Sequence, residues 1–249
     1  MTITALSLGA LLAAAAMETP PAPAAGPSGP LQQKLAPALA RYTDDVLFGT
    51  VWPSPGLSPR DRSLIVISAL IATNKPAQLT GHLNRALANG VTPVEASGVL
   101  THLAFYAGWP NAVSALEVYD RVYTDRKIDV AALQAKVGRL ADDDGFGRSA
   151  EAALAPTAPK FARLSEEVVF GDLWRRSDLS ARDRALVTIA ALTAMGEADQ
   201  LAPYLRRGRE AGLKPAEVTE AITHLAFYAG WPRATEALGS VARTLEAKP

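Results

Sequence analysis

The feature that most constrains this 249-residue chain is a tandem repeat. The decapeptide THLAFYAGWP at positions 101–110 recurs at 223–232, an offset of 122 residues. The same offset aligns 57–116 with 179–238 without a gap, with about half of the positions identical, and it pairs all four tryptophans. This period exceeds that of solenoid repeats, so each copy is expected to be a domain-sized module.

Each module has the sequence pattern of a helical unit. Ala and Leu dominate the apolar residues, and no long segment alternates with a period of two. Ser58 and Ser180 are predicted N-caps, and Asn89-Gly90 is a predicted helix end. The fold class is therefore predicted to be all-α, with helices in the first module at 58–71, 76–88, 93–106 and 111–123, and one at 130–140 in the connector.

Composition excludes several functions. The chain has 25 basic and 25 acidic residues and no basic stripe, so it lacks the electrostatic footprint of a nucleic-acid-binding protein. It has no cysteine, which excludes disulfides, thiolate metal sites and thiol peroxidase chemistry.

The first thirty residues resemble a secretory leader. A short apolar run, MTITALSLGALLAAAAM, precedes a Pro/Ala-rich stretch with A-x-A sites at 14–16 and 22–24. We expect cleavage near Ala25, a periplasmic or secreted protein, and no membrane association of the mature form. Because the first basic residue is Lys34, the alternative is a cytoplasmic protein with a misassigned start or a disordered tail.

One predicted helix carries a stripe of proton-transferring groups. Glu95, His102 and Tyr106 lie on one face, and Glu217, His224 and Tyr228 repeat the pattern. A carboxylate, an imidazole and a phenol in this order are candidates for acid/base catalysis. The alternative is a His and a Tyr that are hydrogen-bonded in the core, with the acid favoured by the helix dipole.

The triplet RDR opens another predicted helix in each copy. Cations are unfavourable in a first helical turn, so Arg60 and Arg62, with Arg182 and Arg184, are expected to have acidic partners. These partners are either carboxylates at an interface or within the chain, which we favour, or a substrate carboxylate.

Two further residue types are candidates for the site. His82 lies near the end of a predicted helix, where a charged imidazole is favoured and a capping role is the alternative. Trp109 and Trp231 stand in Gly-Trp-Pro corners, where lining a substrate pocket and packing in the core are both compatible with the sequence, and we favour the core.

The stretches FGTVWPSPGLSPRDRSL, QLTGHLNRALANGVTPVE and HLAFYAGWPNAVSAL resemble the carboxymuconolactone decarboxylase family, which is related to the AhpD-like alkylhydroperoxidases. The resemblance covers 48–116 and 170–238. It implies two tandem AhpD-like helical modules, threefold assembly as trimers or hexamers, and a cofactor-free lyase that acts on a carboxylated lactone. The positions that match the CxxC pair of the AhpD-like branch hold Lys75 and Gln78, and Glu197 and Gln200.

Neither copy carries the whole family pattern. His82 matches the helix histidine of the family, but Tyr204 stands there in the second copy. The acid expected after TPVE is Gly98 in the first copy and Glu220 in the second.

The resemblance and the residues together predict a cofactor-free decarboxylase of a small carboxylated lactone or enolisable acid. Arg62 would hold the carboxylate, His82 and His102 would exchange protons, and Tyr106 would stabilise the enolate. The first copy would then carry most of the activity. The rival prediction is a non-catalytic binding or assembly protein. A metal site built from His82, His102 and Glu95 falls short of a specific ligand pattern, so no metal is predicted.

The predicted organisation is a leader and tail at 1–30, modules at 31–125 and 160–249, and a connector at 126–159. With two modules per chain, threefold assembly predicts a homotrimer.

Overall fold

The computed structural model describes residues 27–135, 137–141 and 152–246. In these ranges the regular structure is helical, with no strand and one isolated bridge between Arg139 and Arg176. The all-α prediction is therefore confirmed. The predicted cleavage sites lie outside the described residues. No helix in the same ranges has the length and apolarity to cross a membrane.

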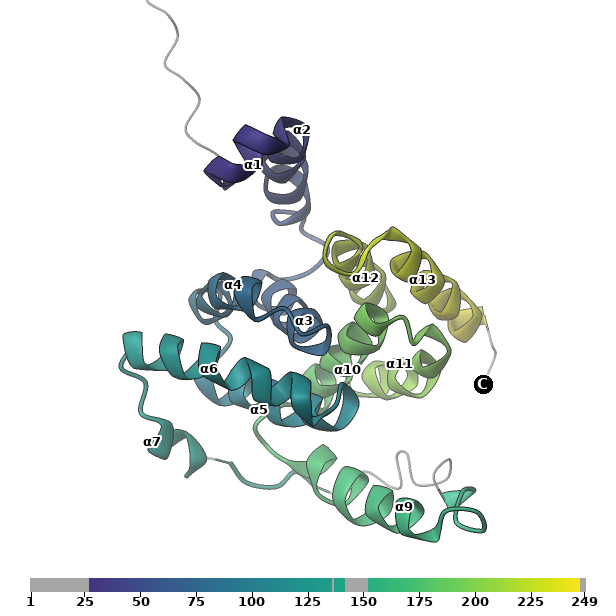
Figure 1. Ribbon diagram of the computed structural model, residues 1–249. Coiled ribbons are helices and arrows are strands. Elements are labelled where there is room, and N and C mark those ends of the chain that lie inside the picture. The colour runs from purple at the N-terminus through teal and green to yellow at the C-terminus, as the bar shows by residue number, and fades with distance from the viewer. Residues whose placement is uncertain (1–26, 136, 142–151, 247–249) are drawn as a thin grey trace, which may run out of the picture.

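The first module begins with an arm and continues as a four-helix unit (Figure 1). Three of the four helices predicted here have the expected bounds to within a residue or two, and the fourth begins two residues early, at Trp109. The elements are α1 (Pro30–Leu35), α2 (Pro37–Arg41), the wide π-helix η1 (Tyr42–Val51), α3 (Pro59–Ala72), α4 (Pro76–Ala88), α5 (Pro93–Tyr106) and α6 (Trp109–Asp125).

The second module repeats this order after the connector. The connector helix α7 (Val130–Gln134) is shorter than the predicted 130–140. The remaining elements are α9 (Pro159–Leu164), η2 (Ser165–Phe170), η3 (Leu173–Arg175), α10 (Ala181–Met195), η4 (Ala198–Gln200), α11 (Leu201–Glu210), α12 (Pro215–Ala229) and α13 (Trp231–Glu246).

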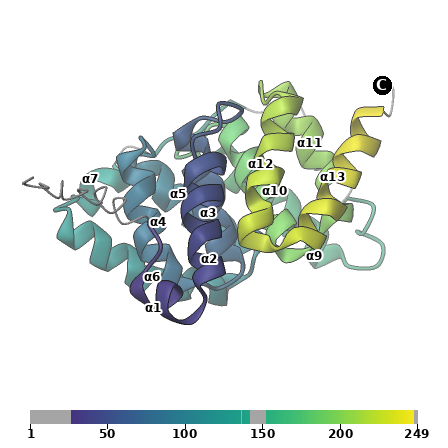
Figure 2. The same ribbon diagram turned by 90° about the horizontal axis from the view of Figure 1, so that it is seen from above.

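The helices α3 and α10 form the centre of one shared core. Every residue from Asp61 to Ala72 is buried, as expected for a helix that is apolar all round. α3 packs against α10, while α12 of the second module packs on α3 and α5 of the first module packs on α10. Figure 2 shows α3 beside α12 where the two halves meet. The modules are therefore crossed: each third helix packs on the central helix of its own module and also on that of the other module.

Side-chain caps fix the starts of the central helices. Ser58 Oγ accepts a hydrogen bond from the backbone N–H of Asp61 at 3.0 Å, and Ser180 Oγ accepts one from Asp183 at 3.1 Å. Both predicted N-caps are confirmed. The caps place the RDR triplets at the boundary between the modules.

The Gly-Trp-Pro corners turn the chain at the surface. Gly108 and Gly230 adopt φ of 92° and 94°, which glycine tolerates without strain. Trp109 is 56% exposed and Trp231 is 61% exposed, and their rings contact Phe105 and Phe227. The core interpretation of these tryptophans is wrong, because the sharp turn points their rings outward.

Candidate functional site

The first arginine of each triplet joins the two modules. The Arg60 guanidinium lies 2.6 Å from Glu95, 2.7 Å from Asp183 and 2.9 Å from Asp61. Burial alone would lower the pKa of Arg60, but hydrogen bonds and charge from Asp183 and Glu95 raise it above its usual value. Arg60 thus has the acidic partners within the chain that its position at a helix start predicts.

The matching arginine, Arg182, completes this network. It lies 2.9 Å from Asp61, 3.1 Å from Asp183 and 3.2 Å from Glu217. Both Arg60 and Arg182 are therefore surrounded by carboxylates of both modules.

Glu95 lies at the helix start rather than beside His102. One oxygen of Glu95 accepts hydrogen bonds from the backbone N–H and hydroxyl of Thr92, and the other pairs with Arg60. The structure thus separates Glu95 from His102 by two helical turns of α5, and Glu217 has the equivalent place on α12.

The second arginine of the first triplet reaches into the other module. Arg62 is fully buried, and its Nη2 donates to Glu220 at 2.6 Å and to the carbonyl of Ser54 at 2.6 Å. Its Nη1 lies 3.2 Å from His224 Nδ1. Arg62 therefore orients a carboxylate and an imidazole that both come from α12.

Four rings gather beside this arginine. Trp52, which follows η1, donates from Nε1 to the Tyr228 hydroxyl at 3.0 Å. Ring centroids lie 5.0 Å apart for Trp52 and His224, and 5.3 Å apart for His82 and Tyr228. We call this cluster site A: it comprises Trp52, Arg62 and His82 of the first module and Glu220, His224 and Tyr228 of the second.

A second cluster repeats the arrangement with the modules exchanged. Arg184 is fully buried, lies 2.8 Å from Asp178 and donates to the carbonyl of Arg176. Trp174 donates to the Tyr106 hydroxyl at 2.7 Å and stacks on Tyr204 at 5.9 Å. We call this cluster site B: it comprises Trp174, Asp178, Arg184 and Tyr204 of the second module and His102 and Tyr106 of the first.

The predicted pairing of His82 with His102 is corrected by this arrangement. Because α12 covers α3 and α5 covers α10, His82 joins His224 in site A, whereas His102 faces Arg184 and Trp174 in site B. Each site therefore mixes the two copies, and neither pocket belongs to one copy.

Each site has one acidic residue and one glycine at a pair of neighbouring positions, and the two residue types stand at opposite positions in the two sites. Position 56 matches 178, and position 98 matches 220. A Cβ on Gly56 would lie 2.9 Å from Glu220, and a Cβ on Gly98 would lie 3.0 Å from Asp178, so each carboxylate fills the space left by a glycine. Site A thus combines His82 of the first copy with the expected acid, Glu220, of the second.

The imidazoles of the two sites differ in their hydrogen bonds. In site B, His102 Nε2 bonds to the Thr188 hydroxyl at 2.7 Å and Nδ1 lies 3.3 Å from Arg184. In site A, Val66 has the position that matches Thr188, and His224 Nε2 has no hydrogen-bond partner among the described residues. His82 Nδ1 is likewise buried without such a partner. Because the Arg62 guanidinium can only donate, His224 Nδ1 accepts its hydrogen bond and His224 Nε2 carries the hydrogen. Site A therefore offers one N–H donor, His224 Nε2, and one further unpartnered nitrogen, His82 Nδ1.

Burial sets the protonation of site A. Desolvation, with the nearby charge of Arg85, lowers the pKa of His82 to about 4. Desolvation, with the charges of Arg62 and His82, lowers the pKa of His224 to about 3. Desolvation raises the pKa of Tyr228 to about 12 despite its hydrogen bond from Trp52. At neutral pH both imidazoles are neutral and the phenol is protonated.

Arg85 is a site residue that the sequence reasoning did not identify. Its guanidinium carbon lies 4.9 Å from the ring centroids of Phe48 and Trp52. The side chain is exposed, and no carboxylate in the described part of the chain lies within ion-pair distance. Its spacing of three from His82 on one helix was the signal available in the sequence. Trp52 and Glu220 were also absent from the predicted site.

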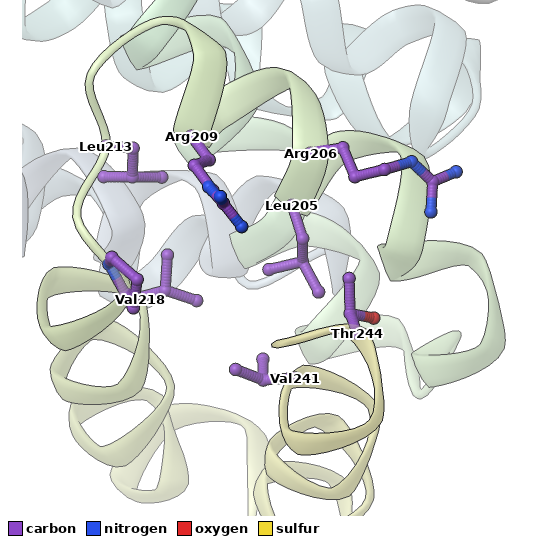
Figure 3. Close-up of a pocket in the computed structure, with 8 residues that line it drawn as sticks. Leu205, Arg206, Arg209, Leu213, Val218, Val241 and Thr244 are labelled. Carbon is purple, nitrogen blue, oxygen red and sulfur yellow. The ribbon is translucent and has the colours of Figure 1, made fainter. Parts of the chain in front are cut away.

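One of two cavities in the described part of the chain lies next to a site. A cavity of about 430 Å³ lies beside site B, and Tyr106 and Tyr204 are in its wall. Figure 3 shows another cavity, between α11, α12 and α13, of only about 30 Å³. The smaller one has room for about one water molecule and is lined by none of the residues of sites A and B. It is therefore no candidate for the reaction.

Comparison of the sequence with protein families shows the family to which the chain belongs. Residues 37–121 and 159–243 each match the carboxymuconolactone decarboxylase family. The chain belongs to this family. Both matches include the central helix and the crossed third helix of a module, the elements that build sites A and B.

Two relatives of this chain are named as decarboxylases. The 4-carboxymuconolactone decarboxylase of Acinetobacter baylyi is 36% identical over 78 residues, which are 31% of this chain and 58% of the relative. The nitrosuccinic acid decarboxylase npaB of Metarhizium robertsii is 35% identical over 78 residues, 31% of this chain and 54% of the relative. The chain thus aligns with somewhat more than half the length of each relative.

Proposed function

We propose that site A is an active site that removes CO2 from a small carboxylated lactone or a related enolisable acid. The observation that carries this proposal is the pair of neutral imidazoles, each with an unpartnered ring nitrogen, in a buried ring cluster beside Glu220. Membership of the family and the names of both relatives support decarboxylation as the reaction type.

The chemistry requires one base, one hydrogen-bond donor and a group that attracts the carboxylate. The substrate enters as its carboxylate; CO2 departs, and the electron pair of the broken C–C bond becomes an enolate. The Tyr228 hydroxyl donates a hydrogen bond to the enolate oxygen. Neutral His82 then relays a proton from water to the carbon that has lost CO2, so one solvent proton replaces CO2 and the residues regain their initial state.

We assign substrate attraction to Arg85 rather than to Arg62. Arg62 is fully buried, and its terminal nitrogens are occupied by Glu220, Ser54 and His224, so in this proposal it positions the site. Arg85 is exposed, lies over the Trp52 ring and carries a guanidinium that suits a carboxylate. Because no cofactor takes part in these steps, we propose that the enzyme is cofactor-independent.

The test is CO2 release by the purified chain from 4-carboxymuconolactone and from nitrosuccinate, which the two relatives are named for. The key variant is His82→Tyr, because tyrosine occupies the matching position in site B. We expect turnover to fall by about 10²–10⁴-fold with the melting temperature nearly unchanged. Tyr204→Phe in site B is the matched control and should retain turnover. Unchanged turnover in His82→Tyr would remove site A from the reaction.

The non-catalytic alternative makes a different prediction for the same samples. A binding or assembly protein would release no CO2 above the uncatalysed rate, whether or not it binds these acids. Incubation of the two acids in D2O extends the test, because a site with working bases also exchanges the acidic C–H of a slow substrate. Absence of both CO2 release and exchange would favour the alternative.

A further inference from the structure

A cavity beside site B has no part in the proposed reaction. Its volume of about 430 Å³ is in the range of small-molecule sites. Tyr106 and Tyr204 in its wall are the counterparts of Tyr228 and His82 in site A. The cavity therefore opens on the place where site A has its second imidazole and site B has a phenol ring.

The wall of this cavity is aromatic and carries no charge. Phe105, Phe161 and Phe170 line it together with the two tyrosines, and the other lining residues are three aliphatic side chains and one serine. Edge-to-face and offset packing against such rings favours a flat ring compound.

The charged groups of site B face one another instead of the cavity. Arg184 and Asp178 form a buried pair, with Asp178 only 3% exposed. His102 is fully buried, and both of its ring nitrogens are engaged. Arg207, the counterpart of Arg85, is not part of the wall and lies 4.0 Å from Glu210. A carboxylate that entered the cavity would lose its hydration without gaining a cation from the wall.

We propose that the cavity beside site B is a second binding site, which takes an uncharged aromatic compound of one or two rings and performs no proton transfer on it. Ring packing and removal of apolar surface from water provide the affinity. The hydroxyls of Tyr106, Tyr204 and Ser165 are the polar groups of the wall, so a phenol or a similarly uncharged ring with one polar substituent fits it. This inference does not depend on catalysis at site A.

The experiment uses the full chain and a matched pair of probes, p-cresol as the uncharged ring and benzoate as the anion, with binding measured by calorimetry. We expect p-cresol to bind to the wild-type chain. Val169→Trp fills the cavity and should weaken p-cresol binding at least tenfold. Arg85→Ala should change p-cresol affinity less than twofold, because Arg85 lies at site A. Tyr204→Ala removes one ring of the wall and serves as the second variant, with circular dichroism reporting the fold of both.

Three results would overturn the proposal. They are failure of p-cresol to bind, equal binding by Val169→Trp in folded form, and benzoate binding of equal strength that Val169→Trp removes. If instead a second copy of the chain covers the cavity, p-cresol does not bind and Val169→Trp lowers the mass measured by light scattering. Loss of CO2 release at site A leaves these outcomes unchanged, so the two proposals fail separately.

Discussion

Arg62 and Glu220 are 158 positions apart, yet a hydrogen bond of 2.6 Å joins them across the boundary between the two modules. The guanidinium is fully buried and the carboxylate is about a quarter exposed. The ion pair occupies space that exists only because residue 56 is glycine. In site B the acid and the glycine are exchanged: Asp178 pairs with Arg184 and fills the space beside Gly98.

Moving the acid within site A should show strong coupling between positions 56 and 220. Glu220→Gly leaves the Arg62 charge buried and is expected to lower the free energy of unfolding by about 2 kcal/mol or more. Gly56→Asp alone crowds Glu220 and also destabilises. The double variant recreates the arrangement of Asp178 and Gly98, so urea unfolding should show recovery of about 1–3 kcal/mol relative to the sum of the single changes. If the losses in unfolding free energy of the two single variants simply add in the double variant, the predicted coupling between positions 56 and 220 is wrong.

His102 and His224 should respond differently to replacement by alanine. His224→Ala removes an imidazole with an unpartnered nitrogen and should lower turnover by about 10²–10⁴-fold. His102→Ala removes the buried hydrogen bonds that the imidazole makes with Thr188 and Arg184 and should mainly lower stability, by about 1–3 kcal/mol. Turnover at equal folded concentration and urea midpoints separate the two effects. The reverse result would move the reaction to site B.

Stability should fall in acid because the imidazoles of site A are buried in their neutral form. Their pKa values, about 4 and about 3, lie below the ordinary value of 6.5. Between the ordinary pKa and the folded-state pKa, the unfolded chain binds protons that the folded chain does not. The contribution of the two neutral imidazoles to the free energy of unfolding is therefore complete above pH 6.5 and declines as the pH falls toward 4. The slope is up to about 1.4 kcal/mol per pH unit for each imidazole.

Urea unfolding at pH 7, 6, 5 and 4 measures this decline. His82→Tyr is the matched control, since it lacks one of the two titrating groups and should show a shallower decline. An equally steep decline in that variant would exclude His82 as a contributor. For the reaction, kcat/KM should be flat between pH 6 and 8 and should fall only as the pH approaches 4.

Assembly should depend on an exposed apolar stripe of α6. Trp109, Val113 and Leu116 follow helical spacing on one face and are each at least half exposed. The expected homotrimer would cover this stripe, so Trp109→Glu and Leu116→Glu should lower the mass measured by light scattering. Thr124→Glu, farther along the same helix, is the control. A monomeric wild-type chain at micromolar concentration would contradict the trimer.

The N-terminus provides an independent prediction. If the first thirty residues include a secretory leader, the mature chain begins near Ala25 and is recovered from the periplasm or the medium. N-terminal sequencing of the protein from fractionated cells measures this. A cytosolic protein that begins at Met1 or Thr2 would show that the segment is not removed.

Local features of the sequence were enough to predict the helices α3 to α6 of the first module. The caps at Ser58 and Ser180, the prolines at first helical positions and the turn at Asn89-Gly90 act within a few residues. Their effects do not depend on distant parts of the chain, so the bounds of α4 and α5 agree with the predicted ranges. The repeat likewise predicted two related modules, and two segments of the chain match the same family.

The tertiary structure alone decided which copy completes which site. A helical repeat is compatible with a third helix that packs on its own module, as α12 does on α10, but it does not specify which further helix that third helix contacts. The crossing of α12 onto α3 brings His224 and Glu220 to His82 and Arg62. The same packing buries Trp52 and leaves Trp109 exposed, since burial depends on contacts between segments far apart in the chain, which the periodicity of one segment does not encode.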